Sequence, residues 1–81
     1  MLRCLIVEDN PLNWMILKKQ AEQMGLQVDV ATNGQEALDY CHNNPLPQLI
    51  VLDGYMPEMD GVTFMKLLRK LPDGDKPYII F

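Results

Sequence analysis

The sequence lacks the features that mark disulfide-stapled, zinc-binding and membrane proteins. Only two of its 81 residues are cysteines, Cys4 and Cys41, and both lie in apolar stretches without the spacing of metal ligands. This pattern argues against a disulfide scaffold and a zinc site, and it indicates two buried thiols in a reducing compartment. Residues 1–7 contain only a handful of apolar side chains, far fewer than a signal peptide or a membrane span needs. We therefore predict a cytoplasmic protein without membrane contact.

Positive charge is also scarce. Seven lysine and arginine residues stand against eleven aspartate and glutamate residues, which gives a net charge of −4. Because such a chain cannot replace the counterions of a nucleic-acid backbone, we expect no nucleic-acid partner. Apolar residues make up 48% of the chain and charged residues 22%, as in an ordinary globular protein, and the length allows one domain at most. We interpret Lys18, Lys19, Arg69 and Lys70 as solvated residues on helix faces.

Hydrophobic periodicity predicts an alternation of short strands and helices. Strands are expected at residues 2–7, 28–31, 49–52 and 77–81, and helices at residues 12–24, 33–41 and 62–71. The first and third strands are apolar enough to be buried on both faces of a parallel sheet. With short connections and right-handed crossovers, this order predicts a flavodoxin-like, doubly wound α/β fold with helices on both faces of the sheet.

Several residues mark where the predicted helices begin and end. Asn10 and Pro11 supply an N-cap and a first helical residue for the first helix, and Gly25 ends it. Asn33 and Glu36 are spaced as a capping box at the start of the second helix. Apolar residues lie on more than one face of the first helix, so we expect it to have neighbours on two sides.

Two acidic residues follow strands that a flavodoxin-like order makes neighbours. Asp9 follows the first strand and Asp53 ends the third, at the edge where open α/β sheets bind their ligands. Two carboxylates about 4 Å apart repel by about 1 to 4 kcal/mol, so a proton or a cation must neutralise them. Mg²⁺ suits this site, with Asp9 and Asp53 as direct ligands and Glu8 acting through water. The ion would also shield an incoming phosphoryl group, so that Asp53 can act as a nucleophile and form an acyl phosphate.

Three motifs resemble the receiver domain of two-component response regulators. They are LIVEDN at residues 5–10, VLD at residues 51–53 and MPEMDG at residues 56–61. The interval from Asp9 to Asp53 is also the one usual in this family. The joint match extends over the whole chain, but the chain does not extend over the whole family domain.

The resemblance implies a role for each matching residue. Asp53 corresponds to the phosphoacceptor, Asp9 to the main metal carboxylate and Glu8 to its outer partner. Tyr55 holds the position whose backbone carbonyl binds the metal, and Asp60 is interpreted as structural. The implied module is not an enzyme. It takes a phosphoryl group from a sensor histidine kinase or a histidine phosphotransfer protein, with Mg²⁺ as its cofactor.

The resemblance also implies that residues 1–81 form an incomplete receiver domain. A fourth helix, a fifth strand and a fifth helix are missing, with the Ser or Thr and the Lys that they normally bring. Because the first strand begins right after Met1, we expect the receiver to stand at the N-terminus of its protein. In the family's strand order 2-1-3-4-5, the missing elements uncover the edge near Tyr78 and one side of the first helix. We therefore expect the 81-residue chain to self-associate.

Two other functions fit parts of the pattern. A haloacid-dehalogenase-type enzyme also forms an acyl phosphate on a strand-end aspartate, but it needs a second acid where Tyr55 stands, and the chain has no room for a cap domain. A degenerate receiver would act through protein contacts alone. The intact Glu8, Asp9 and Asp53 argue against this alternative, and the missing C-terminal third argues for it. His42 follows an ordinary amphipathic helix and is given no role in phosphotransfer.

Overall fold

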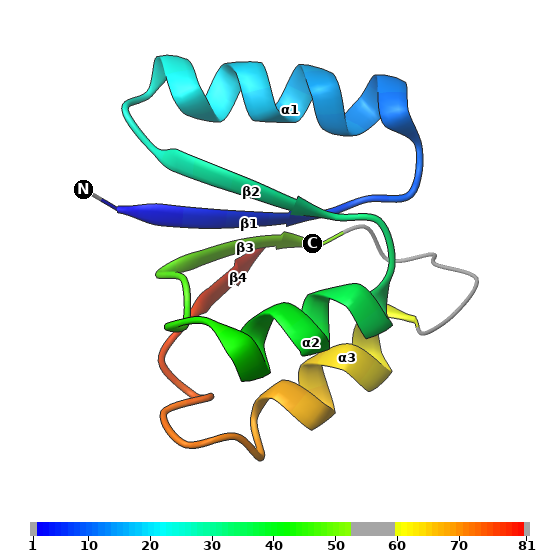
Figure 1. Cartoon of the computed structure of the whole chain (residues 1–81), viewed down its shortest axis with the longest axis vertical. Helices are drawn as coiled ribbons and strands as arrows, with labels where there is room; N and C mark the ends of the chain where they lie inside the picture. Colours follow the sequence, from blue (N-terminus) through cyan, green and yellow to red (C-terminus); the bar gives the residue numbers. More distant parts are fainter. Residues whose placement is uncertain (1, 53–59, 81) are drawn as a thin grey trace.

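A computed structural model describes residues 2–52 and 60–80, in which four strands and three helices alternate (Figure 1). The elements are β1 (Arg3–Val7), α1 (Pro11–Gln23), β2 (Gln27–Ala31), α2 (Gly34–Asn43), β3 (Leu49–Leu52), α3 (Gly61–Leu68) and β4 (Tyr78–Ile80). The strands are parallel and lie in the order β2-β1-β3-β4. The predicted flavodoxin-like α/β fold is confirmed.

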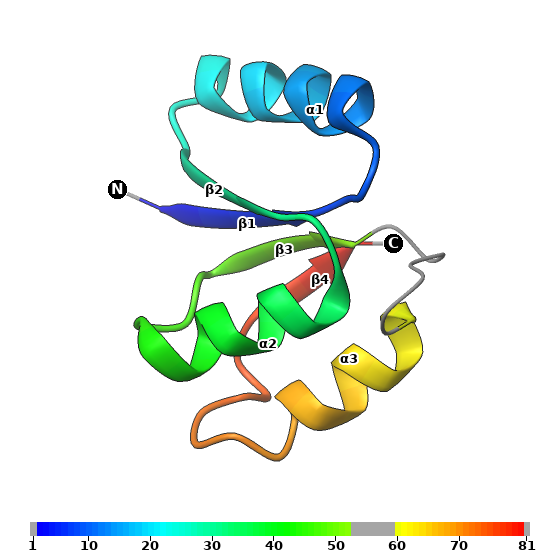
Figure 2. The same ribbon diagram turned by 45° about the vertical axis from the view of Figure 1, so that its right-hand side comes forward.

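The sheet lies between one helix on one face and two on the other. α1 lies over β1 and β2 on one face, and α2 and α3 lie side by side against the opposite face (Figures 1 and 2). The strand order explains this division. The chain moves outward from β1 to β2 and then crosses back past β1 to β3, so right-handed crossovers place the first helix and the next two on opposite faces.

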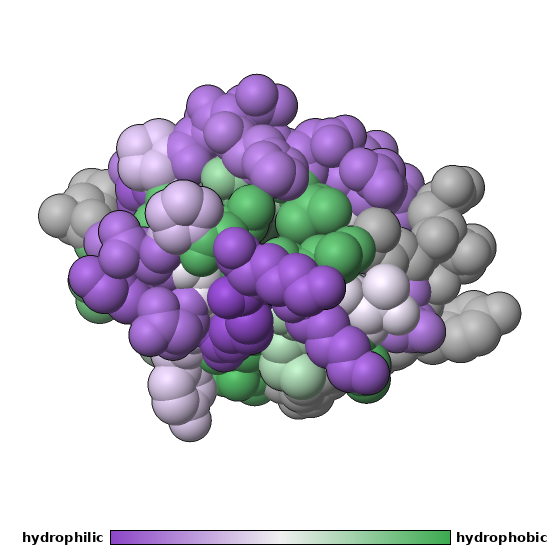
Figure 3. All heavy atoms as spheres, turned by 90° about the horizontal axis from the view of Figure 1, so that it is seen from below, coloured by the Kyte–Doolittle hydropathy of each residue, from purple (hydrophilic) through white to green (hydrophobic). Residues whose placement is uncertain are grey.

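The main core lies between the sheet and the layer formed by α2 and α3. Phe64 of α3 packs there with Leu5 of β1 and Ile50 of β3, and all three are fully buried. Seen from this side, the surface is largely polar, with apolar side chains gathered between the polar ones (Figure 3). α1 contributes less to the core, because none of its residues is buried. The second neighbour predicted for α1 is absent from the described part of the chain.

Side-chain caps fix the starts of all three helices in the described ranges. Asn10 Oδ1 accepts hydrogen bonds from the backbone N–H groups of Leu12 and Asn13, as predicted. Asn33 Oδ1 accepts from the Glu36 backbone N–H at 2.8 Å. The Glu36 carboxylate reaches back to Thr32, from which it accepts the backbone N–H at 3.1 Å and the hydroxyl at 2.8 Å. The predicted capping box is therefore present, with its return bond made one residue before the cap.

The third helix ends earlier than predicted, at Leu68 instead of Leu71. Pro72 has no N–H with which to continue the helical ladder, and the residue before a proline is biased away from the α conformation. The chain continues as turns, in which Leu71 N donates to Leu68 O at 3.0 Å and Gly74 N donates to Leu71 O at 2.8 Å. Gly74 is buried so closely against this helix end that a Cβ atom there would lie 1.9 Å from the Leu68 carbonyl oxygen.

Two arginines make hydrogen bonds that hold the connecting segments at the amino ends of the strands. Arg3 of β1 donates from Nη1 to the Pro45 carbonyl at 2.7 Å and from Nη2 to the Tyr40 hydroxyl. Tyr40 in turn donates to Asp29 Oδ2 at 2.7 Å, so β1, β2, α2 and the chain leading into β3 are joined. Burial raises the pKa of the Tyr40 hydroxyl, and its hydrogen bond to Asp29 adds to this rise. This network was not predicted from the sequence.

Arg69 has the second such role. It is exposed, as predicted, but it caps the end of α3, and its side chain makes hydrogen bonds that were not predicted. Its Nη1 donates to the carbonyl oxygens of Gly74 at 2.7 Å and Pro77 at 3.2 Å, in a partly buried position. The guanidinium therefore holds the turn between α3 and β4 in place. Lys70, the next residue, is exposed as predicted.

The contact of Gly74 with the end of α3 leads to a stability prediction. We expect Gly74→Ala to lower the free energy of unfolding by roughly 2 to 3 kcal/mol, because a backbone carbonyl occupies the space of the new methyl group. Gly25→Ala is the matched control, since Gly25 has a φ of +87° but open space around its Cβ position. The Gly25→Ala change should lower the free energy of unfolding by only about 1 kcal/mol. Urea unfolding followed by circular dichroism measures both, and an equal or smaller cost for Gly74→Ala would contradict the close packing.

Candidate functional site

The carboxyl ends of β1 and β3 meet at one edge of the sheet. In the parallel register, Val7 lies opposite Leu52, the last residue of β3. The backbone N–H of Glu8 donates to Ala31 O at 3.0 Å, so the pairing of this end with β2 continues one residue beyond β1. The predicted acidic residues directly follow these strand ends, at the switch point between α1 and α2 where open α/β sheets bind ligands.

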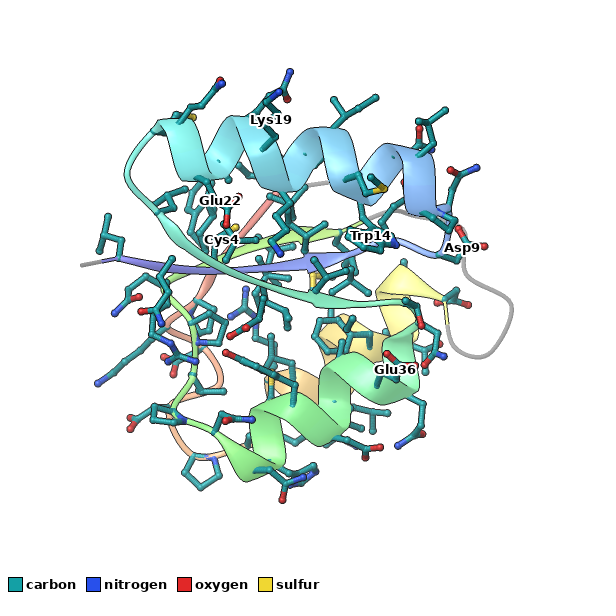
Figure 4. All side chains as sticks on the ribbon, turned by 45° about the horizontal axis from the view of Figure 1, so that its top comes forward. Cys4, Asp9, Trp14, Lys19, Glu22 and Glu36 are labelled. Carbon is teal, nitrogen blue, oxygen red and sulfur yellow. The ribbon has the colours of Figure 1, made fainter. Side chains whose placement is uncertain are left out.

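The two neighbouring acids after β1 have different environments. Glu8 is buried, with 7% of its surface exposed, and its Oε2 accepts a hydrogen bond from the Asn10 backbone N–H at 3.2 Å. Asp9 is exposed, and Figure 4 shows it where the chain leaves β1 for α1. Glu8 is thus held against the start of α1, whereas the Asp9 carboxylate is accessible to an ion from solvent. The roles of Asp9 as the main metal carboxylate and Glu8 as its outer partner stay predictions.

Asp53 and Tyr55, the other two predicted site residues, lie outside the described residues. The convergence of Asp9 and Asp53 therefore stays a prediction. Its basis is the register, because Asp53 follows Leu52 in sequence and Leu52 pairs with Val7. In residues 2–52 and 60–80, no three His, Cys, Asp or Glu side chains are grouped as a metal site. A complete ligand set would need the positions between these two ranges.

Asp60 begins α3 as a structural residue, as predicted. Its Oδ1 accepts a hydrogen bond from the Thr63 backbone N–H at 2.8 Å, which makes it the N-cap of the helix. The same backbone hydrogen bond is the main cause of the lowered pKa of the Asp60 carboxyl. Asp60 thus fixes where the chain enters α3 on returning from the candidate site.

An exposed apolar surface lies beside Asp9 on the first two turns of α1. Leu12, Met15 and Ile16 have 67%, 57% and 51% of their surface exposed. One side of the first helix was expected to be uncovered and to support self-association. Large exposed side chains next to a site often contact a partner, and contact with a different protein at this surface was not predicted.

The cysteines and His42 have no chemical role at this site. Both thiols are free and buried, as predicted, and burial raises the pKa of Cys41 to about 11. A thiol with such a pKa stays protonated and is a poor nucleophile near neutral pH. His42 is exposed at the end of α2. It lines a cavity of about 630 Å³ between the segments that lead into β3 and β4, at the opposite end of the sheet from Glu8 and Asp9.

A membrane-spanning segment was not expected, and within the described ranges none of the helices is long and apolar enough to form one.

Comparison with known protein families gives a match over nearly the whole chain. Residues 4–81 match the response regulator receiver domain. Among curated proteins, the peroxide stress-activated histidine kinase mak3 of Schizosaccharomyces pombe is 39% identical over 85% of this chain. The virulence transcriptional regulatory protein PhoP of Salmonella typhimurium is 41% identical, also over 85% of the chain. The chain spans only 3% of the length of mak3 and 30% of that of PhoP.

A solved structure shows the same architecture. The response regulator protein TrrA from Thermotoga maritima, determined in complex with Mg(2+)-BeF, superposes with a TM-score of 0.89 at 32% identity. The match includes all of this chain and 68% of the TrrA chain.

The cap at Asp60 leads to a prediction about pH. A carboxyl whose pKa is lowered by folding stabilises the fold above its unfolded pKa, here 3.8, and this contribution is lost as pH falls through the folded value. We therefore expect the wild type to lose more stability than Asp60→Asn between about pH 5 and about pH 2.5, because asparagine keeps the cap acceptor but does not titrate. Thermal unfolding at several pH values measures this difference. Asp60→Ala, which lacks the cap, should be less stable than the wild type at neutral pH, and parallel pH profiles for wild type and Asp60→Asn would refute the prediction.

Proposed function

This chain belongs to the response regulator receiver domain family, and from that premise we propose that it is a phosphoacceptor module of a two-component or phosphorelay system. In this proposal Asp53 takes a phosphoryl group from a sensor histidine kinase or a histidine phosphotransfer protein. The observation that carries the proposal is the accessible Asp9 carboxylate at the end of β1, beside the strand whose next residue is Asp53. The family match and the kinship to the histidine kinase mak3 support the choice of partner.

Mg²⁺ is the proposed cofactor. The residues that would hold it are Asp9 and Asp53 through their carboxylates, Tyr55 through its backbone carbonyl and Glu8 through water. This set is made of oxygen donors, which Mg²⁺ prefers. The relative TrrA was solved in complex with Mg(2+)-BeF, which supports the assignment. When bound, the ion neutralises the carboxylates and shields the incoming phosphoryl oxygens from them.

The proposed transfer is a displacement at phosphorus. A carboxylate oxygen of Asp53 attacks the phosphoryl group of a phosphohistidine and forms an O–P bond while the P–N bond breaks. The electron pair of the broken bond returns to the imidazole nitrogen, which takes up a proton from solvent. Asp9 would hold the ion through its carboxylate, and Glu8, which accepts a hydrogen bond from the Asn10 backbone N–H, keeps the start of α1 in position.

The phosphodonor would dock on the exposed apolar turns of α1. Leu12, Met15 and Ile16 are large exposed apolar side chains within seven residues of Asp9 in the sequence. A protein that delivers a phosphoryl group to this end of the sheet must cover this surface or pass close to it. Burying apolar side chains next to the reacting groups would also exclude water from the transfer.

The remaining assignments follow from the same proposal. Residues 1–81 correspond to the part of a receiver domain that precedes its fourth helix, fifth strand and fifth helix, in keeping with the 68% coverage of the TrrA chain. The module is not an enzyme, binds no nucleic acid and no membrane itself, and works in the cytoplasm, where its free thiols stay reduced. A polypeptide of these 81 residues alone self-associates.

The metal assignment predicts a selective loss of affinity. Asp9→Asn is expected to weaken Mg²⁺ binding by at least about tenfold, because a charged ligand is replaced by a neutral one. Titration of Mg²⁺ while the backbone amide signals are followed measures the affinity, and residues 8–10 should shift first. Asp75→Asn, a loss of the same charge in the segment before β4, is the matched control and should leave the affinity within about twofold. Equal weakening in both variants would mean that only net charge matters.

The phosphoacceptor assignment predicts a covalent product on one residue. A protein that contains these residues together with a complete receiver is expected to gain the mass of one phosphoryl group from acetyl phosphate and Mg²⁺. The Asp53→Asn variant should gain none, because an amide cannot form the acyl phosphate. Intact-mass spectrometry makes the comparison. Labelling of Asp53→Asn to the wild-type level would assign the acceptor elsewhere, and no labelling of the wild type would favour the degenerate receiver.

A further inference from the structure

One face of the sheet is only half covered. α1 packs on β1 and β2, and within residues 2–52 and 60–80 no helix lies over β3 and β4 on that face (Figure 2). In the parallel register, Leu49 pairs with both Cys4 and Tyr78, so these three side chains lie on the same face of the sheet. Val51 pairs with Ile80 on that face. We call Leu49, Val51, Tyr78 and Ile80 the open half-face.

The open half-face is apolar and accessible. Tyr78 and Ile80 have 70% and 44% of their surface exposed, and Leu49 and Val51 are partly buried. A hollow of about 180 Å³ separates it from α1, and its lining is apolar apart from Gln20. Two strands spaced about 4.8 Å apart give a strip about 10 Å wide, which is the diameter of one α-helix. The strip therefore has room for one helix.

The chain also carries a helix with an unused apolar surface. Leu12, Met15 and Ile16 on the first two turns of α1 are 51% to 67% exposed, and none of the residues of α1 is buried. We call these three residues the α1 ridge. In the described part of the chain, five of the eight large apolar residues with high exposure belong to the α1 ridge or to β4.

We infer that two copies of the 81-residue chain pack face to face about a two-fold axis, with the α1 ridge of each copy over the open half-face of the other. This inference rests on the proposed self-association and names the surfaces that form it. One chain supplies both a strip that is one helix wide and a helix with a free apolar side, so a single two-fold contact covers both at once. Such a contact is isologous and closed, and it gives a dimer and not a chain of copies.

The exposed area approaches that of a standard dimer interface. The exposed parts of the α1 ridge, Tyr78 and Ile80 amount to roughly 600 Å² per copy, against about 800 Å² per partner in a standard interface and a lower bound of about 1,000 Å² for both partners together. Each copy carries a net charge of −4, so the two copies repel at long range. Salt screens this repulsion, and a dimer held by apolar contact should therefore tighten as ionic strength rises. The α1 ridge is also the proposed docking surface for the phosphodonor, so dimer formation and docking compete.

Sedimentation equilibrium of the 81-residue chain tests the inference. The wild type is expected to be a dimer at tens of micromolar, and Ile16→Glu should weaken the dimer by at least about 100-fold. Val62→Glu is the matched control, because Val62 of α3 is as exposed as Ile16, at 51% each, but belongs to the helix layer on the other face. It should leave the dimer unchanged. Equal weakening in both variants would refute the arrangement.

A cross-linking experiment makes the geometry falsifiable independently of affinity. Ile16→Cys and Tyr78→Cys are made separately and mixed under mild oxidation, and a disulfide between the two different variants is expected to predominate over links within either one. A monomeric wild type would refute both the self-association and this interface, while leaving the metal and phosphoacceptor assignments to their own measurements. A dimer that resists Ile16→Glu and forms no mixed disulfide would keep the self-association and overturn this interface, for example in favour of direct pairing between β4 edges.

Discussion

The parallel pairing of β1 with β3 is the constraint on which the rest of this structure depends. Two parallel strands cannot be joined by a tight turn, so helices must carry the chain back, and these helices cover the sheet. The same pairing brings Val7 opposite Leu52 and so directs the residues that follow both strands to one edge. Burial of β1 on both faces demands its apolar run, which ends where the acids begin.

Stabilising contacts and proposed chemistry lie at opposite ends of the sheet. At the amino ends of the strands, Arg3 and Arg69 donate to backbone carbonyls and hold the connections into β3 and β4. At the carboxyl ends, Asp9 is exposed and the helix starts are held by short side-chain caps such as Asn10. The two arginines thus stabilise the end of the sheet opposite the proposed site.

The half-covered face links the function to the association state. α1 contributes apolar side chains to the β1–β2 half of the sheet and keeps others exposed. Leu12 is three residues after Asp9, and the open half-face adjoins the hollow beside α1. In the proposed arrangements the same helix would contact a phosphodonor or a second copy, and the balance between the two contacts would depend on the concentration of each partner.

Local sequence patterns determined the element order, the helix caps at Asn10 and Asn33, and the candidate acids, because strand runs, cap spacing and motif spacing are local properties of the chain. The early end of α3 could also have been read from Pro72, whose missing N–H stops the helical ladder. Other features were decided only by the tertiary structure. Arg69 appears in sequence as one half of an exposed basic pair, and its hydrogen bonds to Gly74 and Pro77 exist only because the turn after α3 folds back around it. The burial of Glu8 beside an exposed Asp9 likewise depends on where α1 lies over β1, since adjacent carboxylates are chemically alike until packing removes one of them from water.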